Sequence, residues 1–486
     1  MGRQERWDVA VIGAGAVGCA VARDLARYQL SCVVLERAHD VGEGSSKANS
    51  GIVHAGFQPR ARSLKGLSCV RGNELLRTLV HDLEVPFVPC GGMMVAFDDN
   101  GVEKLREKME RGVANGAPGL RIVDGDEARS VEPRLSPAVT AALMAPSTGI
   151  VSPFALVCAL AENAWDNGVE FRFRAAVERV EPCAGGWRLH GADGSAEEAR
   201  FVVNAAGDEA ALLDAQVHPA DVVVRPRLGE YLVFDKQDPA RAVTHVLYQA
   251  AQTDEGGTLL APTVDGNLLA GPTSRNVRDF RTAATSAVGL AHVARVARKL
   301  VPDLDMGAVI RNFAGVRTNI VNVSKELKDF VVRPAAPGFV SVLGIKNPGL
   351  TASPALAREA VAALHREGLP LRERPDFNPH RERYVPFLER DGADQARLLA
   401  ADARYGRVVC RCENVTEGDV RAVLRHPLAP TTLSGVKRRL RCGMGRCQGQ
   451  FCEPRLVQAV ADAWGCAPSA VPEGEYGGRV VMREVK

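Results

Sequence analysis

The sequence lacks the features that mark membrane, secreted and nucleic-acid-binding proteins. No run of 18 apolar residues occurs, whereas a helix that spans a bilayer needs about 20. No apolar signal core precedes the first predicted strand, so we expect a cytoplasmic protein whose thiols stay reduced. A net charge of +3 over 486 residues is too balanced to predict nucleic acid or an anionic membrane surface as the partner.

One strong ligand-binding motif lies close to the start of the chain. Residues 8–12 are typical of a buried strand, and Gly13, Gly15 and Gly18 follow in a Gly-x-Gly-x-x-Gly turn before a helix predicted over 16–27. In dinucleotide-binding folds such glycines allow the tight turn, the approach of a pyrophosphate and the close packing of helix on strand. The helix N-terminus supplies N–H donors. The turn therefore predicts a nucleotide site.

An acidic residue completes this motif. Residues 32–35 predict a second strand, which ends at Glu36, eighteen residues after Gly18. An acid in this place accepts hydrogen bonds from a ribose 2′-hydroxyl. The alternative is a glycine turn without a ligand, but the strand, the helix and the acid together favour a nucleotide site.

The stretch after Glu36 is rich in glycine, serine and asparagine, and it predicts a loop. Its small residues suit a backbone that lies against a flat ligand, and the hydroxyls of Ser45 and Ser46 can donate to phosphate or ribityl oxygens. His54 is the first histidine in a place suited to chemistry. A structural histidine with satisfied hydrogen bonds is the equal alternative.

These motifs resemble those of a known flavoprotein group. The opening turn and the block S-S-x-x-N-S-G-x-x-H-A-G at 45–56 are similar to the D-amino-acid-oxidase-like superfamily. Within it, the chain resembles the glycerol-3-phosphate dehydrogenase and L-2-hydroxyglutarate dehydrogenase branches. The resemblance implies FAD rather than NAD, and no second Gly-x-Gly-x-x-Gly is present for a nicotinamide. It also implies that His54 is the general base, which takes a hydroxyl proton while hydride leaves for flavin N5.

Two later stretches are similar to further FAD-contacting segments of the superfamily. The strand at 201–207, F-V-V-N-A-A-G, matches a signature that approaches the pyrophosphate, although a tight turn is the alternative. The turn at 344–350, before a helix expected from Ser353, matches the segment at the pyrimidine end of the flavin, where Lys346 adds positive charge unless it is an exposed lysine. The resemblance implies cofactor contacts from Gly13, Gly15, Ala16, Val17, Gly18, Glu36, Arg37, Ser45, Ser46, Asn49, Ser50, Gly51, Val177, Ala206, Gly207, Gly344, Lys346, Asn347, Gly349, Leu350 and Thr351.

A Gly-Val-Arg motif at 315–317 resembles the substrate-binding motif of the superfamily, in which the arginine projects toward the acidic group of the substrate. Arg317 is therefore our candidate for binding a carboxylate or a phosphate, a role suited to a planar bidentate donor. A surface ion pair is the alternative. With His54, it makes up the predicted catalytic site.

Cysteine usage divides into scattered and clustered residues. Of the 12 cysteines, most of the scattered ones lie in apolar runs and are expected to be small buried hydrophobes. The clustering of five others predicts a thiolate metal site. Its spacing is not that of a zinc ribbon with two Cys-x₂-Cys pairs. The clustered residues, within 43 positions, are Cys410, Cys412, Cys442, Cys447 and Cys452.

This spacing resembles the bacterioferritin-associated-ferredoxin-like 2Fe–2S domain, seen at the C-terminus of anaerobic glycerol-3-phosphate dehydrogenase relatives. The resemblance implies that Cys410, Cys412, Cys447 and Cys452 supply four thiolates to two irons. Cys442, separated by four residues from Cys447, competes to be the fourth ligand.

Hydrophobic periodicity predicts further elements. We expect a hairpin about the D-G-N turn at 265–267 and strand pairs within 85–97 and 169–180. Thr416 is the expected N-cap of a helix ending near His426, and Thr431 or Thr432 caps the next one. Other helices are predicted over 63–83, 101–115, 154–167, 285–301 and 453–464.

A chain of 486 residues exceeds a single core, so two or three domains are expected. The expected fold class is α/β and α+β: a Rossmann-like FAD-binding domain interleaved with a mixed-sheet substrate cap domain, plus a small helical C-terminal iron–sulfur domain. The expected boundaries are 1–84, 146–215 and 331–365 for the FAD-binding domain, 85–145 and 216–330 for the cap, 366–404 for an extended linker, 405–455 for the 2Fe–2S domain and 456–486 for a tail.

The resemblance implies an FAD-dependent dehydrogenase that oxidises a small anionic hydroxy compound, either glycerol 3-phosphate or a 2-hydroxy acid such as L-2-hydroxyglutarate. Electrons pass to the 2Fe–2S cluster and on to an acceptor protein or subunit. One alternative is an amine or imino-acid oxidoreductase of the same fold. Another is an electron-transfer subunit without substrate turnover of its own. The expected location is cytoplasmic, or peripheral to a membrane through a partner.

Overall fold

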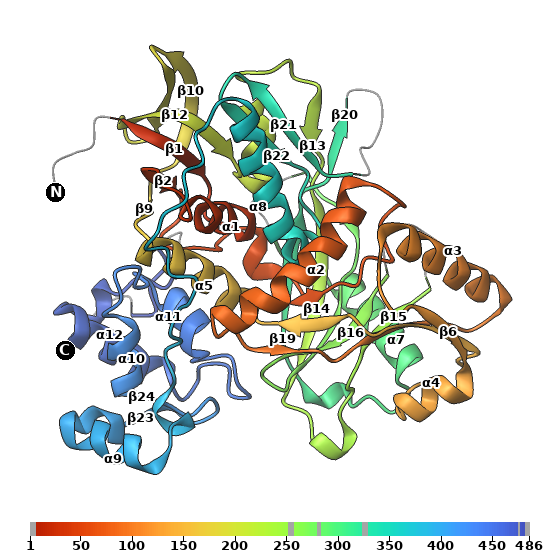
Figure 1. Ribbon diagram of the computed structural model, residues 1–486. Helices are drawn as coiled ribbons and strands as arrows, with labels where there is room; N and C mark the ends of the chain where they lie inside the picture. The colour runs from red at the N-terminus through yellow and green to blue at the C-terminus, as the bar shows by residue number, and fades with distance from the viewer. Residues whose placement is uncertain (1–5, 251–256, 279–282, 323–328, 475–476, 482–486) are drawn as a thin grey trace. The chain divides into compact units, whose positions relative to one another are not determined.

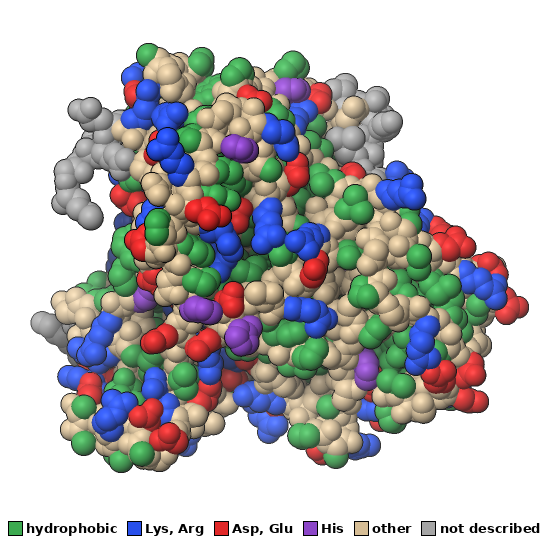
Figure 2. All heavy atoms as spheres, in the orientation of Figure 1, with side chains coloured by type: hydrophobic (Ala, Val, Ile, Leu, Met, Phe, Trp, Pro, Cys, Tyr) green, Lys and Arg blue, Asp and Glu red, His purple; other side chains and the backbone are tan. Residues whose placement is uncertain are grey.

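The computed structural model describes residues 6–250, 257–278, 283–322, 329–474 and 477–481. The chain divides into two compact units, which are described separately. The N-terminal unit consists of residues 1–35 and 42–381, and the C-terminal unit consists of residues 36–41 and 382–486. Among the described residues, no helix is long and apolar enough to cross a membrane. Basic and acidic side chains are interspersed over the face seen in Figure 2, in keeping with the small net charge.

The N-terminal unit contains a sheet with the strand order β10-β11-β12-β1-β2-β9, and β22 and β21 extend it beyond β12. Its central strands are parallel, and most of their residues are buried and apolar, with valine the most frequent. The strands are β1 (Trp7–Ile12), β2 (Cys32–Leu35), β9 (Glu170–Arg172), β10 (Val177–Cys183), β11 (Gly186–Gly191), β12 (Ala196–Asn204), β21 (Val331–Ala336) and β22 (Phe339–Leu343).

Four helices pack beside this sheet: α1 (Ala16–Leu25), α2 (Leu64–Asp82), α5 (Pro153–Asp166) and α8 (Gly349–Arg366). Helix α8 packs on both α1 and α2 (Figure 1). Its start was expected near Ser353, but the helix begins four residues earlier. Pro354 therefore lies inside the helix and not at its start. Proline has no N–H to donate to the carbonyl of Leu350, but the Ser353 hydroxyl donates to that carbonyl at 2.9 Å, so the helix can include the proline.

The N-terminal unit has a second, mixed sheet with the order β18-β14-β17-β16-β15-β5-β7-β6, with β19 also on β14. The predicted D-G-N hairpin is confirmed, because β16 and β17 pair antiparallel across it. The strands are β5 (Gly92–Ala96), β6 (Arg121–Asp124), β7 (Ala141–Ala145), β14 (Arg227–Phe234), β15 (Val246–Gln249), β16 (Leu259–Pro262), β17 (Leu268–Gly271), β18 (Arg275–Asn276) and β19 (Val309–Arg317).

Smaller elements complete this unit. Strands form within 85–97 and 169–180 as predicted, but they do not pair with each other: β4 joins β8 while β5 joins β7, and β9 joins β2 while β10 joins β11. The remaining elements are β3 (Ile52–Val53), β4 (Phe87–Val88), β8 (Gly149–Val151), β13 (Val222–Val224), β20 (Ile320–Asn322), α3 (Asp99–Asn115), α4 (Gly125–Val131), α6 (Ala210–Asp214) and α7 (Ala287–Leu300).

The C-terminal unit is small and mainly helical. Thr416 forms a capping box with Asp419 at the start of α10, and Thr432 caps α11 through the backbone N–H of Gly435, as the sequence predicts. Helix α10 ends three residues before His426. The elements are α9 (Gly392–Ala401), β23 (Val408–Cys410), β24 (Val415–Thr416), α10 (Glu417–Val423), α11 (Leu433–Leu440) and α12 (Glu453–Trp464).

Two details of this unit differ from the expected organisation. The segment 366–404 is not extended throughout, because residues 392–401 form α9 with Asp391 as its N-cap. Helix α12 crosses residue 455, and Leu456, Val457 and Val460 lie in the hydrophobic core of the unit. The first turn of this helix and its later turns therefore share one core, although a domain boundary was predicted between them.

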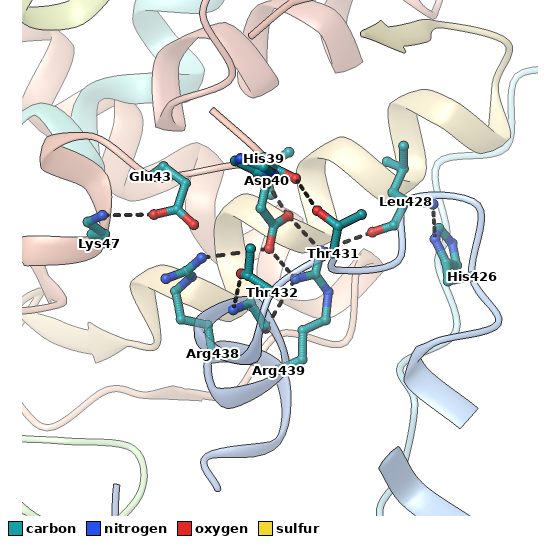
Figure 3. A network of polar contacts seen from close by, with 12 residues as sticks. His39, Asp40, Glu43, Lys47, His426, Leu428, Thr431, Thr432, Arg438 and Arg439 are labelled. Atoms are coloured by element: carbon teal, nitrogen blue, oxygen red, sulfur yellow. Dashed lines mark hydrogen bonds and ion pairs between the residues drawn. The ribbon is translucent and has the colours of Figure 1, made fainter. Parts of the chain in front are cut away.

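The segment 36–41, from early in the chain, packs within the C-terminal unit. The guanidinium of Arg439 donates to both carboxylate oxygens of Asp40, at 2.6 and 2.9 Å, and to the carbonyl of Leu428 (Figure 3). The side chains of the ion pair are only 2% and 9% exposed. A second cation, Arg438, lies 3.8 Å from the same carboxylate. A buried bidentate ion pair thus connects this segment to α11.

Candidate active site and thiol cluster

The carboxyl ends of four parallel strands meet at one edge of the first sheet. Ile12 lies opposite Leu35 on one side and Asn204 on the other, and Asn204 lies opposite Ser341. The turns that follow β1, β12 and β22 are therefore adjacent, although about 330 residues separate the first from the last. Ligands of such sheets bind at this edge. The structure thus brings together the three stretches in which sequence similarity implied FAD contacts.

The backbone of the glycine turn is open to the approach of a pyrophosphate, and two of its positions, Gly13 and Gly18, have no room for a larger residue. Gly13 has φ +98°, and a Cβ there would lie 2.7 Å from the carbonyl oxygen of Ala205. A Cβ on Gly18 would lie 1.9 Å from the carbonyl oxygen of Gly13. Gly15 is the N-cap of α1 and supplies no capping side chain. The start of α1 therefore has no capping side chain of its own, although the N–H of Ala16 donates to the Ser46 hydroxyl, and a helix N-terminus of this kind suits an anionic group.

Several predicted cofactor residues have protein partners that position the loops. The Ser45 hydroxyl donates to the carbonyl of Val316 at 2.9 Å, and the Ser46 hydroxyl accepts from the N–H of Ala16 at 3.0 Å. Asn49 donates to the carbonyl of Ser46 and accepts from the N–H of Gly51. For these residues the geometry accounts for a structural role, and contact with FAD stays a prediction.

The other predicted contacts have varied surroundings. The Thr351 hydroxyl is buried between the carbonyl of Ile52 and the N–H of His54, so it holds the histidine segment on α8. Glu36 follows β2 directly, and its carboxylate accepts from the N–H of Ala38 at 2.8 Å. The remaining residues differ in burial: Arg37 and Asn347 are exposed, Gly51 and Gly349 are buried, and Ser50, Ala206, Lys346 and Leu350 are half-buried. Val177 begins β10. Gly207 and Gly344 have left-handed backbone, with φ of +59° and +71°.

His54 is buried and held at three points. Its backbone N–H donates to Thr351 Oγ1 at 3.0 Å, its Nδ1 lies 3.3 Å from the hydroxyl of Tyr248, and its ring contacts the side chain of Asn347. Burial lowers the pKa of His54 to about 4, and the positive charge of Lys65 acts in the same direction. The imidazole is therefore neutral near pH 7 and able to accept a proton.

Arg317 lies at the end of β19 and makes its contacts with neutral groups. Its guanidinium donates to the carbonyl of Thr273 at 3.0 Å and is 3.5 Å from the hydroxyl of Ser274. It also contacts the hydroxyl of the buried Tyr231. No carboxylate of the described residues forms an ion pair with it. The surface ion pair considered as an alternative is therefore absent from the described part of the chain, which leaves this cation available to an anionic ligand.

Lys65 was missed by the sequence reasoning. It is half-buried in the first turn of α2, close enough to Arg317 and Lys346 for their charges to act on it. Burial and these two cations lower the pKa of Lys65 to about 7. A signal was present: Lys65 lies in register with the buried residues Cys69 and Asn73, at the helix end where a cation is least favourable.

The five clustered cysteines meet in the C-terminal unit. Cys410 contacts the thiols of Cys442 and Cys452, and Cys412 contacts Cys447. The first three of these are buried, and the last two are partly exposed. Thiolates of this number and proximity suit an iron–sulfur cluster.

Backbone N–H groups point at these sulfurs. Glu413 and Gly443 donate toward Cys410, and Phe451 donates toward Cys447. The loop that supplies them has left-handed backbone at Arg441, Gly443, Gln448 and Gly449. Such turns direct successive N–H groups inward, where they stabilise thiolate charge. The donor set therefore fits the predicted cluster, and the contacts include Cys442 as well as the four predicted ligands.

Comparison with known proteins agrees with both sites. A family model described as FAD dependent oxidoreductase matches residues 8–363, and a model described as a BFD-like 2Fe-2S binding domain matches residues 408–462. The chain belongs to the FAD-dependent oxidoreductase family and has a C-terminal 2Fe–2S-binding domain. The predicted family, fold class, enzyme class and cofactors, FAD and a 2Fe–2S cluster, are confirmed.

Particular relatives narrow the class. The chain is 35% identical over 482 residues to a glycerol 3-phosphate dehydrogenase from Caloramator mitchellensis, with 99% of both chains covered. It is 30% identical over 408 residues to the mitochondrial L-2-hydroxyglutarate dehydrogenase of Arabidopsis thaliana, covering 73% of this chain and 82% of the relative. The dithionite-reduced L-α-glycerophosphate oxidase from Mycoplasma pneumoniae, solved with FAD bound, superposes with a TM-score of 0.73 at 26% identity, covering 79% of this chain and 100% of that chain.

Proposed function

We propose that this enzyme oxidises glycerol 3-phosphate at its secondary hydroxyl and delivers the electrons through its 2Fe–2S cluster to an acceptor protein. The observations that carry the proposal are a neutral buried histidine, His54, and a cation, Arg317, that has no acidic partner among the described residues. The similarity of the whole chain to a glycerol 3-phosphate dehydrogenase supports the choice of substrate.

In this proposal, FAD supplies the acceptor for hydride and the cluster supplies one-electron steps. Arg317 holds the anionic end of the substrate through its planar guanidinium. His54 takes the proton of the hydroxyl, which it can do because burial keeps its imidazole neutral. Tyr248 and Thr351 fix the position of the ring and of its backbone. The substrate thus loses a proton to the chain and a hydride to the cofactor, and becomes a ketone.

For the cofactors, we propose that Gly13, Gly15 and Gly18 receive the pyrophosphate of FAD and that Glu36 receives a ribose hydroxyl. The turns at 205–207 and 344–351 complete the site on the same sheet edge. We propose Cys410, Cys412, Cys447 and Cys452 as the ligands of the cluster. A one-electron cluster in the same chain as a two-electron flavin suits delivery to a separate acceptor, since oxygen-dependent flavin oxidation needs no cluster.

Anaerobic mixing of the purified enzyme with candidate substrates tests the proposal. Glycerol 3-phosphate should bleach the flavin absorbance, whereas glycerol, which lacks the anionic group, should not. Bleaching by amino acids but not by hydroxy compounds would reverse the assignment. A purified protein with flavin but no iron or acid-labile sulfide, even after anaerobic preparation, would rule out the role of the cluster.

A second candidate substrate is L-2-hydroxyglutarate. It is favoured by the N-S-G-I-V-H-A-G segment at 49–56 and by the 30% identity to a dehydrogenase of that name. The same bleaching series separates the two compounds by their rates. If His54→Ala leaves turnover unchanged, the chain is instead an electron-transfer subunit without chemistry of its own.

A further inference from the structure

The ammonium of Lys65 has no acidic partner among the described residues, in a place that disfavours a positive charge. The residue is two positions after Ser63, the N-cap of α2, and is half-buried. Its backbone N–H donates to Asp329 at 2.8 Å, but its ammonium forms no ion pair with any acid among the described residues. The ring of Phe330, 5.7 Å from the ammonium, carries no net charge. The helix dipole at this end is positive, and the carboxylate of Asp329, which accepts from the backbone N–H groups of Leu64 and Lys65, offsets it without forming an ion pair with the ammonium.

Two other cations act on the same site from separate elements. Arg317 comes from the end of β19, and Lys346 comes from the turn between β22 and α8. Buried charges in proteins are normally paired, because removal from water is unfavourable unless an opposite charge replaces it. Arg317 also lacks an acidic partner in the described ranges. Since no described acid forms an ion pair with either cation, and Asp329 is bound to the backbone of α2, an anionic ligand is the complement that Lys65 and Arg317 could share.

We propose that Lys65 determines substrate specificity by acting with Arg317 to bind a dianionic substrate, so that hydroxy compounds with a phosphate or a second carboxylate are preferred over monoanionic hydroxy acids such as lactate. The proposal rests on the proposed function of the site. It extends that function by assigning a residue and a charge to the selection of substrate. A phosphate can occupy both cations at once, whereas a dicarboxylate can place one carboxylate on each.

The charged and titratable groups around Lys65 give the expected pH dependence. Asp329 and Cys69 favour its protonated form, while Lys346, Arg317 and burial disfavour it, and the neighbouring His54 is neutral. Because the pKa of Lys65 is lowered to about 7, the free enzyme loses this charge as the pH rises through 7. Dianion binding should weaken over the same range. An arginine at this position would stay protonated and should remove the dependence.

The test compares Lys65→Met and Lys65→Arg with Arg71→Met as the matched control. Arg71 is on the same helix, has a side chain that is 52% exposed, and pairs only with Glu74. The probe for binding is inorganic phosphate, and glutarate is the dicarboxylate arm, both followed by the change in flavin absorbance without turnover. Lys65→Met should weaken phosphate binding at least tenfold, Lys65→Arg should restore it, and Arg71→Met should match the parent enzyme.

In turnover, Lys65→Met should raise the KM for glycerol 3-phosphate at least tenfold, change kcat less than threefold, and leave lactate kinetics unaltered. Unchanged phosphate and glutarate binding in Lys65→Met, or an equal loss for dianions and lactate, would overturn the proposal. Flavin content and thermal unfolding show whether Lys65→Met folds. If it does not, the test is the pH profile of phosphate binding in Lys65→Arg, which should lack the loss of binding that the parent enzyme shows as the pH rises through 7. If no hydroxy compound bleaches the flavin, the proposed function fails, while the binding of phosphate still tests Lys65.

Discussion

At the scale of single residues, charge and burial decide which side chains can act. His54 and Lys65 are both titratable and both deprived of water, but burial has different consequences for them. A neutral imidazole is ready to accept a proton, whereas a lysine with a pKa near 7 changes its charge within the working range. The sequence indicated the first residue by its motif. The second was hidden because its partners are distant in the chain.

Replacing His54 should affect chemistry more than binding. His54→Ala is expected to lower the rate of flavin reduction roughly 10²–10⁴-fold, the usual contribution of a general base. The dissociation constant of phosphate should change little, because the anion is held elsewhere. Since the pKa of His54 is about 4, the parent enzyme should show no loss of rate from this residue between pH 8 and about pH 5. An equal loss in binding and rate would contradict the assigned role.

At the scale of elements, the glycine turn before α1 is specified by local geometry. Gly13→Ala should abolish retention of FAD, since the new Cβ would strain the backbone and clash with Ala205. Gly368→Ala is a matched control, because Gly368 has nearly the same φ, +99°, with no heavy atom within 4 Å of the added Cβ. The control should lose about 1 kcal/mol of stability and keep its flavin. The amount of flavin released by denaturation measures how much FAD each variant retained. Equal amounts from Gly13→Ala and Gly368→Ala would refute the expectation.

The pairing of Asp40 with α11 is an element-scale contact of the C-terminal unit. Arg439→Ala leaves a buried carboxylate and should lower the free energy of unfolding of this unit by roughly 3–5 kcal/mol. Arg397→Ala, which removes an exposed partner of Asp394, should change it by less than about 1 kcal/mol. Loss of the cluster absorbance in denaturant reports the transition. Similar midpoints for both variants would show that the buried pair is not stabilising.

At the scale of the whole molecule, the proposed electron route passes through the cysteine cluster. Cys452→Ala should remove the 2Fe–2S spectrum, whereas Cys442→Ala should keep it, because the proposed ligands are the other four thiols. In the cluster-free variant, substrate should still bleach the flavin, but reduction of a one-electron acceptor should fall at least tenfold. Electron paramagnetic resonance of the reduced enzyme checks the cluster. If the cluster signal is lost in Cys442→Ala and kept in Cys452→Ala, then Cys442, and not Cys452, is the fourth ligand.

Much of the architecture followed from short-range pattern. The strand–turn–helix at 7–25, the D-G-N hairpin and the caps at Thr416 and Thr432 depend on residues a few positions apart, and their predictions are confirmed. Which strands pair with one another could not be predicted from short-range pattern. Strands β4 and β5 are neighbours in sequence but join different sheets, because burial of each face against distant strands outweighs local pairing.

The sequence alone was enough to predict the nature of the cofactor sites, since a glycine turn is constrained over a few bonds and the clustered cysteines have a spacing that resembles a known 2Fe–2S domain. Tertiary structure was needed for the proposed substrate site. His54, Lys65, Arg317 and Lys346 span almost 300 positions, and the fold brings His54, Arg317 and Lys346 close enough to Lys65 for electrostatic interaction. Electrostatic coupling depends on distance in space and on the loss of water, and neither is written in sequence spacing.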